Sequence, residues 1–149
     1  MAAGLVAAPL YTRDILRLAA SLGEPAVLGR LDGAVERRSA TCGSRISVAV
    51  TLVEERVDAV SQRVEACAFG QAAAALMIAN APGLTAAEAR IALGGIERWL
   101  SGDDGAVTAW PGLGVLDPAR ARAGRHQAIL LPFAALLGAI EAAEVTDKQ

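Results

Sequence analysis

A pair of alternating segments near the middle of the chain constrains its fold more than any other feature. Between Arg45 and Val53, long or branched aliphatic residues recur at every second position, namely Ile46, Val48, Val50 and Leu52. Val57–Glu65 shows the same period, with one face formed by Val60, Gln62 and Val64. A period of two is that of a β-strand with one buried face. Because only a short link containing Glu54 and Glu55 separates the segments, we expect them to form an antiparallel hairpin.

The remaining patterns add one polar edge strand and several helices around this hairpin. The edge strand is predicted over Ala34–Thr41, just before a turn at Cys42 and Gly43. Helical patterns occupy about 11–22, 70–81, 86–100, 119–123 and 125–143. Pro132 falls inside the last pattern, which predicts either a helix start near Leu131 or a kink at the proline. Strands followed only by helices predict the α+β class, with a small antiparallel sheet of two or three strands packed against several helices.

The length favours a single domain. A chain of 149 residues matches one compact unit, so we expect one domain over 1–149 with loose ends at about 1–10 and 144–149. Hydrophobic residues make up 54% of the chain but aromatic residues only 3%, so the core must be built from Leu, Val, Ile and Ala.

Charge and hydropathy exclude several partners. The formal net charge is −2, whereas nucleic-acid binding needs clustered positive charge. The nearest basic run, which contains Arg120, Arg122, Arg125 and His126, is interpreted as a solvated loop. The first ten residues lack a positively charged signal segment, and the apolar run 127–140 is too short to span a bilayer. We therefore expect a cytoplasmic protein without a membrane partner, in which two cysteines bind metal, react or are buried rather than forming a disulfide.

Three residues of scarce types are the candidates for chemistry: Cys42, Cys67 and His126. Each is predicted at the boundary of an element, and Cys67 directly precedes a helix N-terminus, where free N–H groups favour a thiolate. Taken singly, each has a plainer interpretation, since lone cysteines are often small buried side chains. No C-x-x-C motif is present, so spacing alone leaves an α+β domain of open function.

Three segments, in order, resemble the U-type iron–sulfur assembly scaffolds, the family of IscU, SufU and the N-terminal domain of NifU. They are Thr41-Cys42-Gly43-Ser44, Ala66-Cys67-Ala68-Phe69-Gly70-Gln71-Ala72 and Arg125-His126-Gln127-Ala128-Ile129-Leu130. The resemblance implies a SufE/NifU-like fold and a role as an iron–sulfur assembly scaffold or sulfur acceptor, not as an enzyme. It also implies a cysteine desulfurase as partner, with iron–sulfur carriers or assembly proteins downstream.

The sequence departs from the family pattern at two positions. Ser44 stands where the family has an aspartate after Cys-Gly, and Gln127 stands where it has a third cysteine beside the histidine. The long segment between Cys67 and His126 resembles SufU-type members. The proline-rich chaperone motif of IscU-type members is absent before His126, which also favours the SufU type.

The resemblance implies Cys42, Cys67 and His126 as metal ligands, with Ser44 and Gln127 as auxiliary residues. These would hold a transient [2Fe–2S] cluster or zinc. Three protein ligands with one open position suit zinc, whereas a [2Fe–2S] cluster usually takes four. The alternative is a degenerate scaffold-fold module that docks on a cysteine desulfurase and binds zinc or no metal. A third possibility, an unrelated metal-dependent enzyme, lacks an acid–base constellation in this sequence.

Overall fold

The computed structural model describes residues 11–40 and 43–147. Within them it places three strands, four α-helices and two short 3-10 helices. In chain order these are α2 (Arg13–Ala20), β1 (Gly33–Arg38), β2 (Arg45–Val53), β3 (Arg56–Glu65), α3 (Ala68–Asn80), α4 (Ala86–Leu100), η1 (Asp104–Ala109), η2 (Leu113–Ala119) and α5 (Ala123–Asp147). The predicted α+β class is confirmed.

The three strands form one antiparallel sheet in the order β1-β2-β3. The hairpin predicted from the alternating segments is β2 and β3, joined by a two-residue turn at Glu54 and Glu55. Both turn residues have positive φ, 52° and 67°, as the common two-residue hairpin turn requires. The predicted edge strand is β1, which begins at Gly33 and ends at Arg38, three residues before the predicted end.

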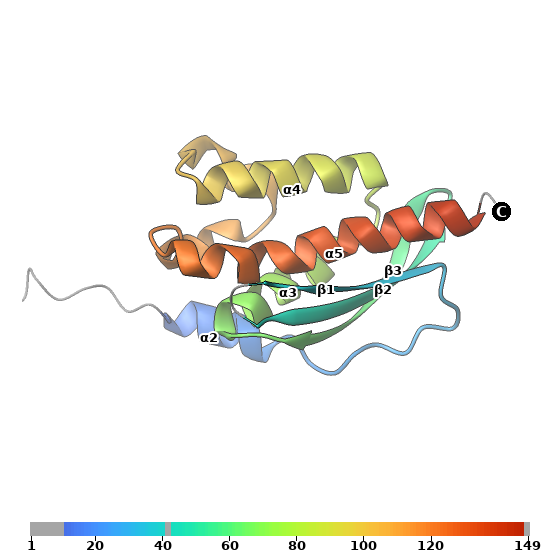
Figure 1. The fold of residues 1–149 in the computed structure, drawn as a ribbon, viewed down its shortest axis with the longest axis horizontal. Coiled ribbons are helices and arrows are strands. Elements are labelled where there is room, and N and C mark those ends of the chain that lie inside the picture. The colour runs from blue at the N-terminus through green and yellow to red at the C-terminus, as the bar shows by residue number, and fades with distance from the viewer. Residues whose placement is uncertain (1–10, 41–42, 148–149) are drawn as a thin grey trace, which may run out of the picture.

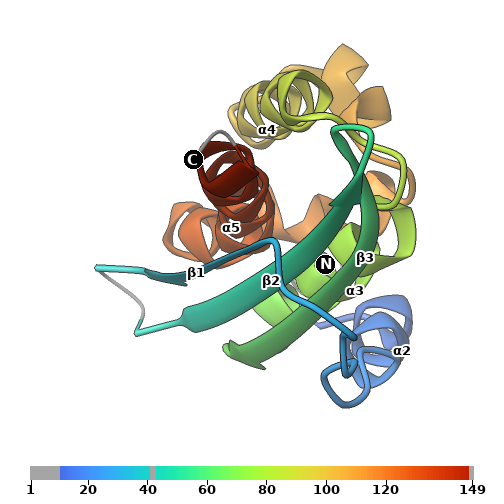
Figure 2. The same cartoon turned by 90° about the vertical axis from the view of Figure 1, so that its right-hand side faces the viewer.

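The helices form layers on the sheet (Figure 1, Figure 2). Helix α5 lies along β1 and β2, while α3 contacts β3 and lies between α2 and α5. Helix α4 packs on α5 on the side away from the sheet. The apolar faces of β2 and β3 are thereby covered, and Ile46, Val48 and Val50 are at most 1% exposed.

Small residues let α5 approach the sheet closely. A Cβ added at Gly33, the first residue of β1, would lie 2.1 Å from the carbonyl oxygen of Ala139 and 2.5 Å from the backbone nitrogen of Ala143. No side chain fits in that space. The glycine therefore fixes the distance between β1 and α5, and with it the position of the N-terminal half of α5 near the other end of β1.

The scarce aromatic residues occupy the centre of the helical layers. Trp99, Phe69 and Phe133 are at most 2% exposed. The indole Nε1–H of Trp110 donates to the carbonyl oxygen of Leu76 at 2.7 Å, and its ring meets Phe133 edge-on at 4.9 Å. The expected aliphatic core is thus supplemented by a few aromatic side chains that join η1, α3 and α5.

The C-terminal third differs from the prediction. Helix α5 begins at Ala123 and continues to Asp147, so Pro132 lies inside it and a start near Leu131 is wrong. The helix continues past the proline because Ile129, Phe133, Leu136 and Ile140 follow a helical period and are buried. The short helix predicted over 119–123 is also misplaced, since η2 ends at Ala119.

Helix α5 is longer than the apolar run seen in the sequence. By length and composition alone its segment Ala123–Thr146 could cross a bilayer, since an 18-residue window within it has a mean hydropathy of 1.8. However, 56% of this window is buried inside the protein, where α5 packs on β1, β2, α3 and α4. A central core helix is apolar for that reason.

Candidate functional site

Cys67 lies where the sequence predicted it, between β3 and α3. It is the N-cap residue of α3, with extended backbone angles of φ −66° and ψ 173°. Its carbonyl oxygen accepts a hydrogen bond from the backbone N–H of Gln71 at 3.0 Å, which begins the helix. The thiol is free and half-buried. The free N–H groups of the first turn of α3 and the positive end of its dipole surround this position.

The first turn of α3 lies against the start of α5. A Cβ added at Gly70 would meet the Cβ of Ala66 at 2.6 Å and the carbonyl oxygen of Ala128 at 3.4 Å. Gln71 donates through its side-chain amide to the carbonyl oxygen of Ala66 at 3.0 Å, which fixes the turn before the helix. Cys67 is therefore held on a rigid segment beside the residues that precede Ile129 in α5.

The ends of β1 and β2 meet the same region. The β2–β3 ladder ends with Arg45 opposite Glu65, and the next residue before Arg45 is Ser44. The backbone N–H of Ser39 donates to the carbonyl oxygen of Ser44 at 2.8 Å. The hydroxyl of Ser39 in turn donates to Oε1 of Gln127 at 2.7 Å. The two auxiliary residues predicted from the sequence, Ser44 and Gln127, are thus brought together through Ser39.

Cys42 lies outside the described residues. On either side of it, Ser39 and Ser44 are hydrogen-bonded, and Gly43 adopts a positive φ of 71°. A glycine is favoured there because other residues rarely adopt this conformation. Ser39, which precedes Cys42 in the chain, is therefore bonded both to Ser44, which follows it, and to Gln127.

His126 lies in the first turn of α5, as predicted, but its ring is engaged with the backbone. Its Nε2 lies 2.9 Å from the carbonyl oxygen of Arg120 and 3.2 Å from that of Ala119. Across residues 11–40 and 43–147, no three His, Cys, Asp or Glu side chains gather into a metal-binding group. The proposed ligand set of Cys42, Cys67 and His126 stays a prediction, because one of its members is Cys42.

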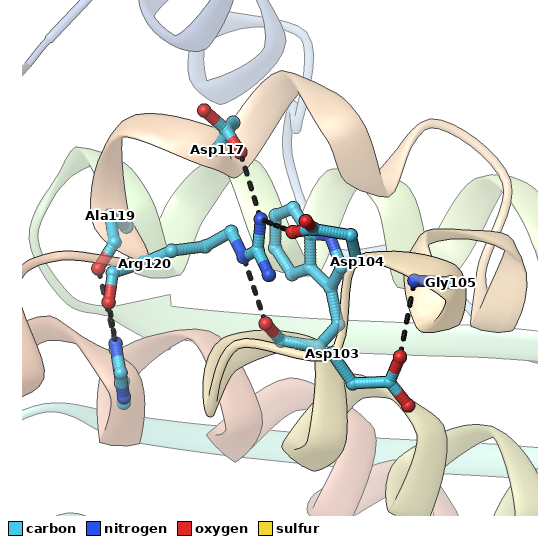
Figure 3. A network of polar contacts seen from close by, with 8 residues as sticks. Asp103, Asp104, Gly105, Asp117, Ala119 and Arg120 are labelled. Atoms are coloured by element: carbon cyan, nitrogen blue, oxygen red, sulfur yellow. Dashed lines mark hydrogen bonds and ion pairs between the residues drawn. The ribbon is translucent and has the colours of Figure 1, made fainter.

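The sequence interpretation missed a polar network centred on Arg120 (Figure 3). Its Nε–H donates to the carbonyl oxygen of Trp99 at 2.8 Å, and its Nη1 pairs with Asp104 at 2.6 Å and Asp117 at 3.4 Å. The guanidinium lies 4.8 Å above the ring of Trp99. We call Trp99, Asp104, Asp117 and Arg120 the Arg120 network.

The Arg120 network corrects one expectation. Arg120 was interpreted as part of a solvated basic loop, yet only 19% of its side chain is exposed. Hydrogen bonding to Asp104, and then to Asp117, raises the pKa of Arg120, so the guanidinium stays charged. The sequence contained a signal for this network in Asp104 and Asp117, which are acidic residues close to Arg120 in the chain.

Comparison with solved structures relates the fold to known proteins. No family model matches the sequence, and no curated protein matches it either. A nitrogen-fixing NifU-like protein (N-terminal) from Brucella abortus is similar with a TM-score of 0.79 and 28% identity, over 91% of this chain and 95% of that one.

Two further structures are similar at lower identity and show the fold alone. A putative iron–sulfur cluster assembly scaffold protein for the SUF system from Fervidobacterium islandicum AW-1 has a TM-score of 0.75 and 20% identity, over 88% of this chain and 96% of its own. A hypothetical protein has a TM-score of 0.73 and 21% identity, over 89% and 97%. The expected NifU-like fold is confirmed by these neighbours.

Proposed function

We propose that this chain is a scaffold protein of iron–sulfur cluster assembly, which carries a transient [2Fe–2S] cluster as cargo and catalyses no reaction of its own. Two of its structural neighbours are named as NifU-like or iron–sulfur scaffold proteins, and both align over about nine-tenths of the chain. The single observation that carries the proposal is the place of Cys67. In a fold shared with such proteins, it is the N-cap residue of α3, whose first turn packs against Ala128 near the start of α5.

The chemistry of the donors supports this role. Cysteine thiolates are the ligands of iron–sulfur clusters, and Cys67 is free and partly accessible. We infer that Cys42 supplies the second thiolate, because Ser39, which precedes it, bonds to Gln127 at the start of α5, and Ser44, which follows it, bonds to Ser39. A cysteine desulfurase would supply sulfur, and downstream carriers or assembly proteins would receive the cluster. A reducing cytoplasm would keep both thiols available.

The donor set is incomplete for a permanently held cluster. A [2Fe–2S] cluster usually takes four protein ligands, whereas Cys42, Cys67 and His126 would supply three. Gln127 bonds to Ser39 through its amide oxygen and is a poor substitute for a thiolate. We therefore expect the fourth ligand to come from an external thiol or from a partner, which suits cargo that must be released. Zinc, which tolerates three protein ligands and one open position, is the alternative metal.

A second candidate function is a docking module that has lost the cluster. It is favoured by Gln127, which occupies the place of the family's third cysteine and is hydrogen-bonded to Ser39. Such a module would keep the fold and its contact with a cysteine desulfurase without holding iron. The extra residues between Cys67 and His126, which include η1 and η2, favour the SufU type under either function.

The proposal is tested by the iron and sulfide content of protein purified without oxygen. We expect iron and sulfide in equal amounts in the wild type and a loss of both in Cys42→Ala and in Cys67→Ala, because each variant removes one of two thiolates. Thr146→Ala is the matched control. Its hydroxyl donates to the carbonyl oxygen of Ala142, near the other end of α5, so this variant should keep the wild-type content.

The other outcomes separate the alternatives. If the wild type contains zinc without sulfide, and both cysteine variants lose the zinc, the site binds zinc and not a cluster. Wild-type protein without bound metal, in the presence of a desulfurase that it still binds, would favour the docking module. Equal iron in the wild type and both cysteine variants would overturn the ligand assignment.

A further inference from the structure

We infer that Arg120 is a positioning residue for His126, which it holds in the tautomer with a proton on Nε2, so that only Nδ1 can accept a metal. The part concerning the metal rests on the proposed function. The tautomer of His126 is a property of the protein without metal, so that part does not depend on the proposed function.

The hydrogen-bond partners of His126 determine its tautomer. Nε2 lies 2.9 Å from the carbonyl oxygen of Arg120 and 3.2 Å from that of Ala119. Carbonyl oxygens only accept hydrogen bonds, so the nitrogen facing them must donate. A neutral imidazole carries one proton, and with that proton on Nε2 the lone pair is on Nδ1.

The two carbonyl groups are held in place by the Arg120 network. Arg120 follows η2 as its C-cap, and its backbone N–H donates to the carbonyl oxygen of Asp117 at 3.0 Å. Its guanidinium is fixed by the carbonyl oxygen of Trp99 and by Asp104, over the indole ring. Ala119 is fully buried. The acceptors that select the tautomer are therefore anchored to α4 and η1 through one side chain.

The same geometry decides which nitrogen of His126 can ligate. Binding a metal through Nε2 would break both hydrogen bonds to η2, whereas binding through Nδ1 leaves them intact. Histidine ligands commonly donate their other ring N–H to a carbonyl or carboxylate, which fixes the ring and raises its basicity. In this chain the carbonyl oxygens of Ala119 and Arg120 would have that role, and Arg120 would set their position.

The experiment is 15N NMR of the imidazole in protein without metal. The chain contains one histidine, so its two ring nitrogens need no sequential assignment. In mildly alkaline buffer we expect a protonated Nε2 and an unprotonated Nδ1 with well-separated shifts, because the carbonyl oxygens of Ala119 and Arg120 face Nε2. In Arg120→Gln the shifts should move toward a common averaged value, because the carbonyl groups lose their anchor.

Two further variants make the experiment specific. Arg98→Gln is the matched control, since Arg98 is an exposed arginine that pairs with Asp103 at 3.9 Å, and it should keep the wild-type shifts. If Arg120→Gln does not fold, Asp104→Asn takes its place. It alters one exposed partner of the guanidinium and should move the shifts in the same direction by less.

The outcomes that would overturn the inference are distinct. A proton on Nδ1 in the wild type would disprove the tautomer, and wild-type shifts in both network variants would disprove the role of Arg120. In the wild type, addition of Zn²⁺ should shift the Nδ1 signal while the proton on Nε2 is kept. A shift of the Nε2 signal with loss of its proton would disprove ligation through Nδ1. Absence of any zinc effect would contradict ligation by His126 and not the tautomer.

Discussion

At the scale of single residues, the most informative position is Gln127. It stands where the resemblance places a third cysteine, and in the structure its amide oxygen accepts a hydrogen bond from the hydroxyl of Ser39 at 2.7 Å. The backbone of Ser39 is bonded in turn to that of Ser44. In this chain the side chain at position 127 therefore joins α5 to Ser39, the residue that follows β1.

A cysteine at this position should restore a metal ligand. We expect Gln127→Cys to raise the affinity for Zn²⁺ at least about tenfold, equal to ~1.4 kcal/mol, because a thiolate would replace an amide next to the other donors. The measurement is competition with a chromophoric chelator under reducing conditions.

The control for this substitution is Gln127→Ala, which removes the hydrogen bond to Ser39 without adding a ligand. It should leave the zinc affinity at or below that of the wild type. Equal affinities in the cysteine and alanine variants would show that residue 127 does not face a metal site.

At the scale of elements, the contact between β1 and α5 positions the candidate site, because His126 and Gln127 lie on α5. Gly33→Ala should lower the free energy of unfolding by ~3 kcal/mol, at the upper end of the usual range for overpacking. The added Cβ would lie 2.1 Å from the carbonyl oxygen of Ala139, and backbone atoms cannot move aside as a flexible side chain can. Urea unfolding measures this difference.

Two other glycines serve as controls for that prediction. Gly29→Ala places a Cβ with no neighbour within 4 Å and should change the stability by no more than ~0.5 kcal/mol. Gly138→Ala would meet the end of the flexible Arg37 side chain at 2.6 Å, so its cost should lie between the other two. A loss in Gly33→Ala no larger than in Gly29→Ala would contradict the close packing of β1 on α5.

The same elements show how far the fold could be predicted. The hairpin depends on residues close in sequence, and the structure confirms it. The helix caps are local in the same sense, since Thr12 and Thr85 each accept from a backbone N–H three residues later. The path of α5 past Pro132 could not be predicted in this way. It depends on burial of one helix face against the sheet, α3 and α4, which are distant in the sequence.

The candidate site was predictable to a similar degree. The place of Cys67 at a helix N-terminus follows from local pattern, and the structure confirms it. The bonds of His126 to the carbonyl oxygens of Ala119 and Arg120, and the anchoring of Arg120 by Asp104 and the backbone of Trp99, join separate turns and helices. The periodicity of a sequence does not predict contacts between separate elements. The sequence therefore indicated His126 as a candidate but not the arrangement of its hydrogen bonds.

At the scale of the whole molecule, α5 is the element that joins the sheet to the helical layers. It packs on β1 and β2 on one side and on α3 and α4 on others, and the buried apolar residues of strands and helices form one continuous core. Helix α5 covers β1 and β2, α3 contacts β3, and α4 packs on the far side of α5. The high mean hydropathy of an 18-residue window of α5, 1.8, is explained by this position.

A single continuous core predicts a single unfolding transition. We expect tryptophan fluorescence, which reports Trp99 and Trp110 in the helical layers, and far-UV circular dichroism, which reports the whole chain, to give the same urea midpoint. The slope should lie at ~1–3 kcal/mol per molar urea, as for other small domains. The midpoint should also be the same at two protein concentrations, which excludes dissociation as the event observed.

A loss of fluorescence at lower urea than the loss of ellipticity would show that α4, η1 and their contacts unfold before the sheet. In that case the Arg120 network, which ties η2 to α4 and η1, would be broken while α5 and the sheet were still folded.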